Sequence, residues 1–408
     1  MQVRTMVAAW AVLGLASWAS AGVAKLDEGA AVPLEPFVRQ GAEWLVRAQH
    51  PDGGWGAGSH ARQDIRDPRQ VVTDPATTAF VGLALLRGGS TPEAGPHREA
   101  LRRATFYLLD VVEKAPPNGP RVTDIAGTQP QAKLGPLVDT GMTSQYLARV
   151  LPLLPKGSPL RARVDAALDR CVHKLEESQT ADGSWKSGSG WAPVLESSVS
   201  TSALEMAQAA GKTVNPAKLD KARQYQKGRY DAASGRAESG DAAGVELYAF
   251  SSAQRANAAD AALAEQQLEA AKEKSVLPKD APVTEDNLKK AGVDERKAKS
   301  LNDAYHSNRA QLRRLSDEQL LNGFGSNGGE EYLSYLQTSE SLVLAGGGEW
   351  DAWKKKMTVR LAKIQSDDGS WTGHHCITSP VFCTAAVLQI LTADRDRAVR
   401  QHIARVTQ

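Results

Sequence analysis

The sequence is poor in cysteine, in aromatic residues and in any excess of one charge. Three cysteines in 408 residues are too few for the disulfide framework of a small secreted scaffold. Lysine and arginine (49) nearly balance aspartate and glutamate (47), so we expect no nucleic-acid partner. A 41% hydrophobic fraction with 24% charged residues excludes a wholly disordered chain. The length allows two or three domains, or one large domain built from repeats.

Long apolar runs are also missing beyond the first residues. Residues 1–21 carry Arg4, an apolar stretch from Met6 to Trp18, and the small-residue sequence Ala19-Ser20-Ala21. This pattern predicts a cleaved signal peptide, with a buried core helix as the alternative. The apolar stretch is too short to cross a bilayer. We therefore expect an exported mature chain, periplasmic or extracellular, without a transmembrane segment.

One motif occurs three times in the same register, as LVRAQHPDGGW, LEESQTADGSW and LAKIQSDDGSW. Helical apolar spacing precedes each copy, and a Ser/Thr-rich, strongly apolar helix is predicted after it. The Asp-Gly pair ends the first helix, because glycine adopts the left-handed backbone found there. The unit is therefore an amphipathic outer helix, a tight turn and a buried inner helix. The shared positions are Gln49, Asp52, Trp55, Gln179, Asp182, Trp185, Gln365, Asp368 and Trp371.

These stretches resemble the QW repeats of squalene and oxidosqualene cyclases and of related prenyltransferase-type proteins. The resemblance covers roughly residues 36–250 and 325–392. It implies an all-α fold, an α/α-toroid in which inner helices form a barrel inside a ring of outer helices. Repeats of about 45–60 residues predict about five or six helical hairpins. In that superfamily the glutamine holds a neighbouring helix end and the tryptophan packs beside it, so the resemblance implies that the motif is structural. Carbohydrate stacking by the tryptophans is the alternative.

Residues 253–320 interrupt the repeats. They contain no tryptophan or phenylalanine, and twelve basic residues balance twelve acidic ones. The pattern predicts a charged helical hairpin, exposed to solvent and inserted between two parts of the toroid, 22–252 and 321–408. With few large apolar side chains, it is expected to be dispensable for folding. A docking arm for a partner is the alternative.

The motifs that carry the known reactions of this superfamily are missing. The sequence has no DxDD, no DDxxD and no CGEQ, so the catalytic residues are unknown. The stretch Phe382-Cys383-Thr384 resembles the one that carries the zinc histidine of protein prenyltransferases, but Cys383 stands in place of that histidine. The partner Asp-x-Cys does not appear in the preceding repeat, which reads Glu330-Glu331-Tyr332-Leu333-Ser334. We expect no cofactor, with zinc at His375, Cys376 and Cys383 as the alternative.

The soft-ligand cluster itself consists of His374, His375, Cys376 and Cys383. Export and the short gap of six residues between them predict a disulfide between the two cysteines, with both histidines exposed beside it. A position at the beginning of an inner helix is expected to favour thiolate over thiol. A metal site and free buried thiols are the alternatives.

Several acidic residues lie near the predicted beginnings of inner helices, where the helix dipole favours a carboxylate. The alternative is that a pair of them lines the cavity for glycoside chemistry. The candidates are Asp139, Glu196, Glu330, Glu331 and Glu340.

Taken with the missing motifs, the sequence favours an exported toroid that binds an apolar or extended ligand, or a protein partner, in its central cavity without cyclase chemistry. An isoprenoid enzyme, cyclase-like or prenyltransferase-like with diverged catalytic residues, is the second hypothesis. A polysaccharide-active α/α-barrel enzyme is the third.

Overall fold

The structure is a computed structural model that describes residues 34–186, 190–346 and 348–396. The predicted signal peptide, residues 1–21, lies outside the described residues. The described residues, 34–396 with these gaps, form one compact unit. Within the described ranges, none of the helices combines the length and the hydropathy that a bilayer crossing requires.

The fold is all-α, as expected. In the described part of the chain the strands are limited to one short antiparallel pair, β1 (Tyr230–Asp231) and β2 (Arg236–Ala237). The remaining regular structure is helical. The inner helices are α2 (Pro75–Arg87), α5 (Val138–Val150), α7 (Pro193–Ala209), α9 (Glu246–Glu273), α13 (Gly329–Ala345) and α15 (Pro380–Leu391). The outer and connecting helices are α1 (Pro36–Arg47), α3 (Arg98–Lys114), α4 (Gln129–Lys133), α6 (Pro159–Ser178), α8 (Pro216–Lys227), α10 (Glu285–Lys290), α11 (Glu295–Arg314), α12 (Glu318–Leu321) and α14 (Glu349–Ala362).

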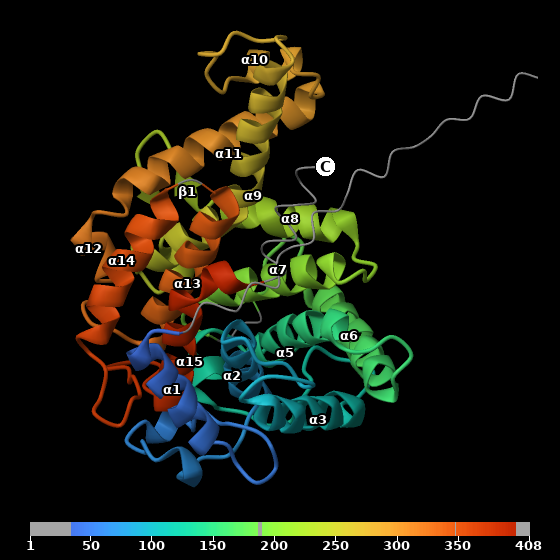
Figure 1. Cartoon of the computed structure of the whole chain (residues 1–408), viewed down its shortest axis with the longest axis vertical. Helices are drawn as coiled ribbons and strands as arrows, with labels where there is room; N and C mark the ends of the chain where they lie inside the picture. The colour runs from blue at the N-terminus through green and yellow to red at the C-terminus, as the bar shows by residue number, and fades with distance from the viewer. Residues whose placement is uncertain (1–33, 187–189, 347, 397–408) are drawn as a thin grey trace, which may run out of the picture. The chain divides into compact units, whose positions relative to one another are not determined.

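The inner helices form a closed ring. Each packs against the next in chain order, and α15 packs against α2 to complete the circle. The outer helices α1, α3, α6, α8, α11 and α14 pack against this ring from outside, and Figure 1 shows α1, α3, α6 and α14 around α2, α5, α13 and α15. The architecture is therefore the predicted α/α-toroid, with six hairpins.

Local sequence explains where the inner helices begin. Those that follow the three repeat motifs start with Pro75, Pro193 and Pro380, because proline has no N–H to leave unpaired in a first turn. Asp74 and Ser379 cap the first and last of these helices through their side chains. Apolar and small residues on all sides keep α2 and α15 almost wholly buried.

The three tryptophans of the repeat motif have the same environment. Each is fully buried, and its indole N–H donates to the carbonyl of a leucine ten residues earlier, at 2.7–2.8 Å. Its backbone N–H donates to a hydroxyl of the following inner helix, on Thr78, Ser197 or Thr384. The tryptophan thereby joins the outer helix to the inner helix of its own hairpin.

The glutamines join neighbouring hairpins. Each side-chain amide donates to the carbonyl of the motif glycine, and also to a carbonyl near the beginning of the next outer helix. For Gln49 that acceptor is Ala100, and for Gln179 it is Lys218. For Gln365 it is Phe37 in α1, at 2.9 Å, so the last repeat is bonded to the first helix and closes the ring.

The motif aspartates hold their own turns. Asp52, Asp182 and Asp368 each accept the backbone N–H two residues later, at 2.9–3.0 Å. This local bond stabilises the turn in which the following glycine has a positive φ.

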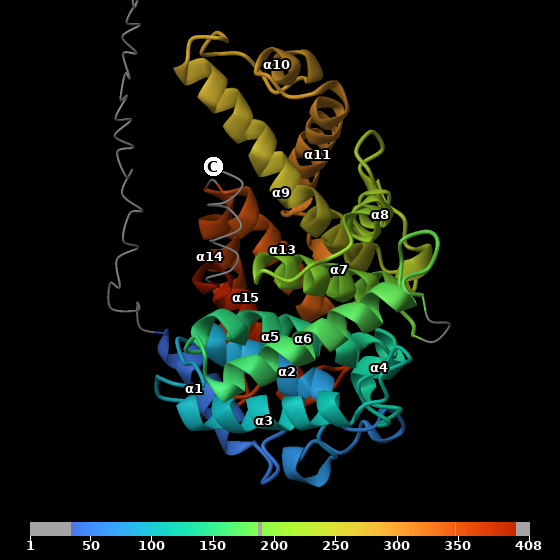
Figure 2. The same cartoon turned by 90° about the vertical axis from the view of Figure 1, so that its right-hand side faces the viewer.

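The segment 253–320 divides into two parts with different packing. Helix α9 runs unbroken from Glu246 to Glu273, and its first half lies in the main core. Its second half packs with α10 and the beginning of α11 around a separate small core that includes Leu268, Leu288 and Leu301. Figure 2 shows α9 and α11 running together away from the ring, with α10 at the far end. We call residues 262–302 the arm.

The end of α11 belongs to the ring. Leu312 and Leu315 pack against the main core, and the side chain of Gln311 donates to the carbonyl of Phe250 in α9. Leu320 and Leu321 of α12 are buried in the same core. The charge pattern that marks 253–320 in the sequence therefore spans both the arm and the fifth outer helix.

Candidate functional site

Four of the five acidic candidates lie at one end of the barrel, where the inner helices begin. Asp139 and Glu196 occupy the first turns of α5 and α7, and Glu330 and Glu331 occupy the first turn of α13. All four are buried. Glu340 is in the last third of α13, so it lies toward the opposite end. The structure thus separates a group that the sequence presented together.

Asp139 is paired with a carboxylate that sequence reasoning missed. It accepts the backbone N–H of Ala76 at 3.0 Å and the side-chain amide of Gln131 at 2.6 Å. Burial raises the pKa of Asp74 to about 6. Burial and the neighbouring charge of Asp74 raise the pKa of Asp139 to about 7. The Asp-Pro sequence before a Thr-rich helix was the available signal for Asp74, as a helix N-cap.

Glu196 ties α7 to the beginning of α5. Its carboxylate accepts the backbone N–H of Leu137 at 2.6 Å. The same carboxylate lies against Gly135, where an added Cβ would come within 2.1 Å of it, and Gly135 has φ +141. Only glycine fits there, because a side chain would displace the carboxylate. Glu196 therefore has a defined positioning role between two hairpins.

Glu331 is the most heavily bonded of the acids. It accepts the backbone N–H groups of Gly328 and Phe324 at 2.9 and 3.1 Å, and the phenolic O–H of Tyr248 at 2.5 Å. The pKa of Tyr248 is raised by burial and by the carboxylate. These bonds satisfy the Glu331 carboxylate and fix the beginning of α13.

Glu330 has fewer donors. The backbone N–H of Ile377 donates to it at 3.2 Å. Burial and the charge of Glu331 raise the pKa of Glu330 to about 7, so near neutral pH it exists in both protonated and ionised forms. The charge of Glu330 also acts on the half-buried thiol of Cys376. Glu330 is therefore a buried acid that can hold or release a proton beside a half-buried thiol.

The predicted disulfide does not form in the structure. All three cysteines are free thiols. Cys376 has a left-handed backbone, φ +59, and its half-buried thiol feels the charge of Glu330. The Cys383 thiol is buried in α15 and donates to the carbonyl of Ile377 at 3.5 Å. The two sulfur atoms have different partners, which explains why sequence spacing alone was misleading.

The expected thiolate is also wrong. Burial, with the charge of Glu330, raises the pKa of Cys376 to about 12, and burial raises that of Cys383 well above its ordinary value. Desolvation and nearby carboxylates outweigh the helix dipole here.

The two histidines also differ in their burial and contacts. His374 is exposed, whereas His375 is half-buried, with Nε2 2.7 Å from the Ser326 carbonyl oxygen and 3.4 Å from a Glu331 oxygen. In the described part of the chain, no three His, Cys, Asp or Glu side chains are placed to hold a metal ion. The residues proposed for zinc, His375, Cys376 and Cys383, are not brought together as ligands.

Three side chains that the sequence did not single out lie near Glu330 and Cys376 or near their neighbours Lys133 and His375. Lys133 is buried, yet its charge acts on both groups. Its ammonium lies 3.9 Å from the ring centroid of Trp191, which is 64% exposed. Phe324 is 63% exposed, and the centroid of its ring lies 5.1 Å from that of the His375 ring. We call Lys133, Trp191, Phe324, Glu330 and Cys376 the rim.

Below the rim, the inner helices carry buried polar groups without partners. In residues 34–186, 190–346 and 348–396, nine such side-chain atoms lie in the second to fourth turns of four consecutive inner helices. They belong to Thr143, Ser144, Ser198, Ser200, Gln254, Asn257, Ser334 and Thr338. We call these residues the polar belt.

The opposite end of the barrel is closed by buried ion pairs. Arg87 contacts Glu340 and Asp396, and Arg149 contacts Asp396 at 2.8 Å. Arg255 joins Glu340 to Glu205 at 3.5 and 3.2 Å. Arg223 of α8 also contacts Glu205, at 2.8 Å, and the network ties together α2, α5, α7, α8, α9, α13 and the segment after α15.

Comparisons with known proteins leave the activity open. No family model matches the chain, and no curated protein matches it. Among solved structures it is similar to the type II terpene cyclase MstE from Scytonema, with 15% identity, a TM-score of 0.44, and coverage of 87% of this chain and 96% of that one. A variant of that cyclase in complex with its product, merosterolic acid A, gives 15% identity, a TM-score of 0.46, and coverage of 88% and 96%. Likenesses this distant assign no activity.

Proposed function

We propose that the chain is a binding protein whose ligand is an extended, hydroxyl-rich chain such as an oligosaccharide, held inside the ring of inner helices below the rim. Of the two ligand types expected from the sequence, apolar or extended, the structure favours an extended polar one. The observation that carries this choice is the polar belt.

The energetic reason is the desolvation of the polar belt. A buried hydroxyl or amide without a partner costs about 1–3 kcal/mol, and an apolar ligand would leave all of these groups unpaired. Water or ligand hydroxyls would satisfy them. A chain that carries many hydroxyl groups can replace the water one bond at a time, with little loss of hydrogen bonding.

The rim supplies the complementary contact. The exposed face of Trp191 is available for stacking on a sugar ring. The buried ammonium of Lys133 packs against the indole and keeps it in place. Aromatic side chains contribute large contact areas at low cost in conformational entropy.

Calorimetric titration of the mature chain with a linear neutral hexasaccharide tests the proposal, with squalene as the apolar comparison. We expect the saccharide to bind. Trp191→Ala should weaken binding roughly threefold to tenfold, and Gln254→Leu should weaken it further by removing two polar atoms of the belt. Val359→Ala, at a position 67% exposed on α14, is the matched control and should change nothing. Binding of squalene without the saccharide would refute the polar ligand.

A second candidate is an enzyme that donates a proton from Glu330, whether to an isoprenoid or to a glycosidic oxygen. It is favoured by the raised pKa of Glu330, about 7, and by the neighbouring Cys376 and Lys133. Glu330→Gln separates the two functions. It should abolish any product detected by mass spectrometry if Glu330 is a catalytic acid, and it should leave product-free binding intact if the protein only binds.

Export is part of the proposal and is supported by the sequence of residues 1–21. N-terminal sequencing of the protein recovered from the periplasm or medium tests it. A mature N-terminus just after Ala21 is expected, and an intact Met1 in a cytoplasmic fraction would refute export.

A further inference from the structure

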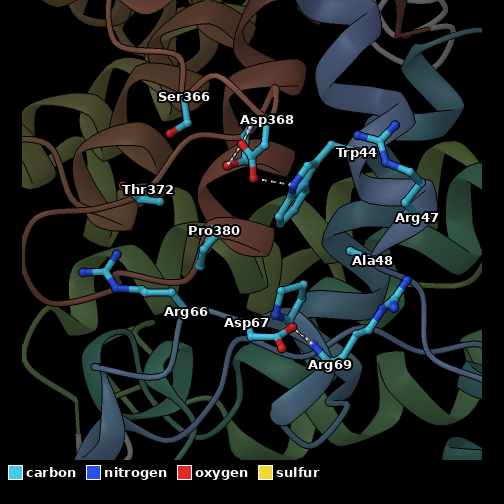
Figure 3. Close-up of a pocket in the computed structure, with 12 residues that line it drawn as sticks. Trp44, Arg47, Ala48, Arg66, Asp67, Arg69, Ser366, Asp368, Thr372 and Pro380 are labelled. Atoms are coloured by element: carbon cyan, nitrogen blue, oxygen red, sulfur yellow. Dashed lines mark hydrogen bonds between the residues drawn. The ribbon is translucent and has the colours of Figure 1, made fainter.

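A groove of about 460 Å³ lies where the first and last hairpins meet (Figure 3). One wall comes from α1, with Trp44 and Arg47. The second comes from the segment 66–69, and the third from the last repeat turn and the beginning of α15. We call it the seam groove, because the bond from Gln365 to Phe37 closes the ring between the same two hairpins.

The acidic side chains of the seam groove already have donors. Asp368 accepts the backbone N–H and the hydroxyl of Ser370 at 2.9 and 2.7 Å, and the indole N–H of Trp44 at 2.8 Å. Asp67 accepts the backbone N–H of Arg69 and the side chain of Gln70, both at 3.0 Å. Both carboxylates accept hydrogen bonds from neutral donors only, and the charges of Arg47 and Arg69 act on Asp368 and Asp67 without a hydrogen bond between them.

The arginines of the groove are in the opposite situation. In the described part of the chain, the guanidinium groups of Arg47 and Arg69 make no ion pair and no hydrogen bond. Arg66 uses one nitrogen to donate to the carbonyls of Gly373 and Thr378, at 3.2 and 2.9 Å. In the view of Figure 3, Arg66 stands on one side of Pro380, and Arg47 and Arg69 stand on the other.

We propose that the seam groove binds a small molecule with two anionic groups, carboxylate or phosphate, one held by Arg66 and the other by Arg47 and Arg69. A guanidinium donates two parallel hydrogen bonds to either group, so arginine suits both chemistries. Trp44, Pro68 and Pro380 provide an apolar surface between the cationic ends. The volume fits a compact organic acid or phosphate ester.

Calorimetric titration of the mature chain with citrate and with pyrophosphate tests this assignment, with sorbitol as the neutral comparison. We expect at least one anion to bind with a submillimolar Kd that weakens as salt is added, and sorbitol not to bind. The anion that binds more tightly identifies the chemistry. Binding of neither anion below millimolar concentration would overturn the proposal.

The double variant R47Q/R69Q removes two charges at exposed positions, so the fold should be kept. It should weaken binding at least tenfold, while Arg296→Gln, at an exposed position on α11, leaves it unchanged. Arg66 is left intact because it also holds the backbone of the last repeat. Equal affinities of the double variant and of Arg296→Gln would show that an adventitious ion only had bound, and would refute the site.

Discussion

Replacing Gln365 with leucine tests whether the ring depends on the bond that closes it. The side-chain amide donates to Phe37 in α1 and to Gly369 in its own turn, both at 2.9 Å. Leucine has a similar volume and no donor, so the variant loses two partly buried hydrogen bonds. At about 1 kcal/mol each, the free energy of unfolding should fall by about 2 kcal/mol.

Gln179→Leu is the matched control, because Gln179 makes the same two bonds inside the chain, to Gly183 and to Lys218 at the beginning of α8. Urea denaturation should give a similar loss for both variants. Hydrogen exchange should distinguish them: amides of α1 should exchange up to roughly 30-fold faster in Gln365→Leu, and amides of α8 in Gln179→Leu. An unchanged α1 in Gln365→Leu would refute the claim that this bond closes the ring.

Three further outcomes follow from the buried groups. Asp74, Asp139 and Glu330 have raised pKa values of about 6, 7 and 7, so the folded state retains protons that the unfolded state has already lost. The stability that these protonated acids contribute is complete below about pH 4 and is lost as the pH rises through 6–7. The urea midpoint of unfolding should therefore fall between pH 5 and 8. Asp139→Asn should make the urea midpoint less dependent on pH. Glu340→Gln removes one of the two carboxylate partners of both Arg87 and Arg255. It should lower the free energy of unfolding by about 3–5 kcal/mol. A loss under 1 kcal/mol would mean that water solvates the network. Replacing the arm, residues 262–302, with a short Gly/Ser linker should lower the Tm by only a few degrees, because its core is separate; removing 253–320 instead should prevent folding, and circular dichroism melts would show both results.

The toroid could be predicted because its repeat motif acts over short distances. The indole of Trp55 bonds a carbonyl ten residues away, and Asp52 bonds an amide two residues away. Such contacts need particular residues at fixed spacings, so three copies are visible in one sequence. The hairpins without the motif gave no such signal, and only packing placed their helices in the ring.

The arm shows the limit of reading composition. Balanced charge and helix-forming residues continue through 253–320, and nothing in the pattern marks where α9 leaves the ring. The boundary depends on which apolar side chains meet. Leu268 meets the small core of the arm, and Leu312 meets the main core. Both positions have the same helical periodicity, so only the tertiary structure separates them.

The site shows the same division. By itself the sequence determined that acids stand near the beginnings of inner helices, because capping is local chemistry. Only the tertiary structure decided their partners, since Glu196 bonds an amide 59 residues away, and the charge of Glu330 acts on Cys376, which belongs to a different hairpin. It also decided which hydroxyls of the polar belt lack partners. A hydrogen bond is satisfied or missing according to what packs beside it, and that depends on the closed ring of helices, which no single segment specifies.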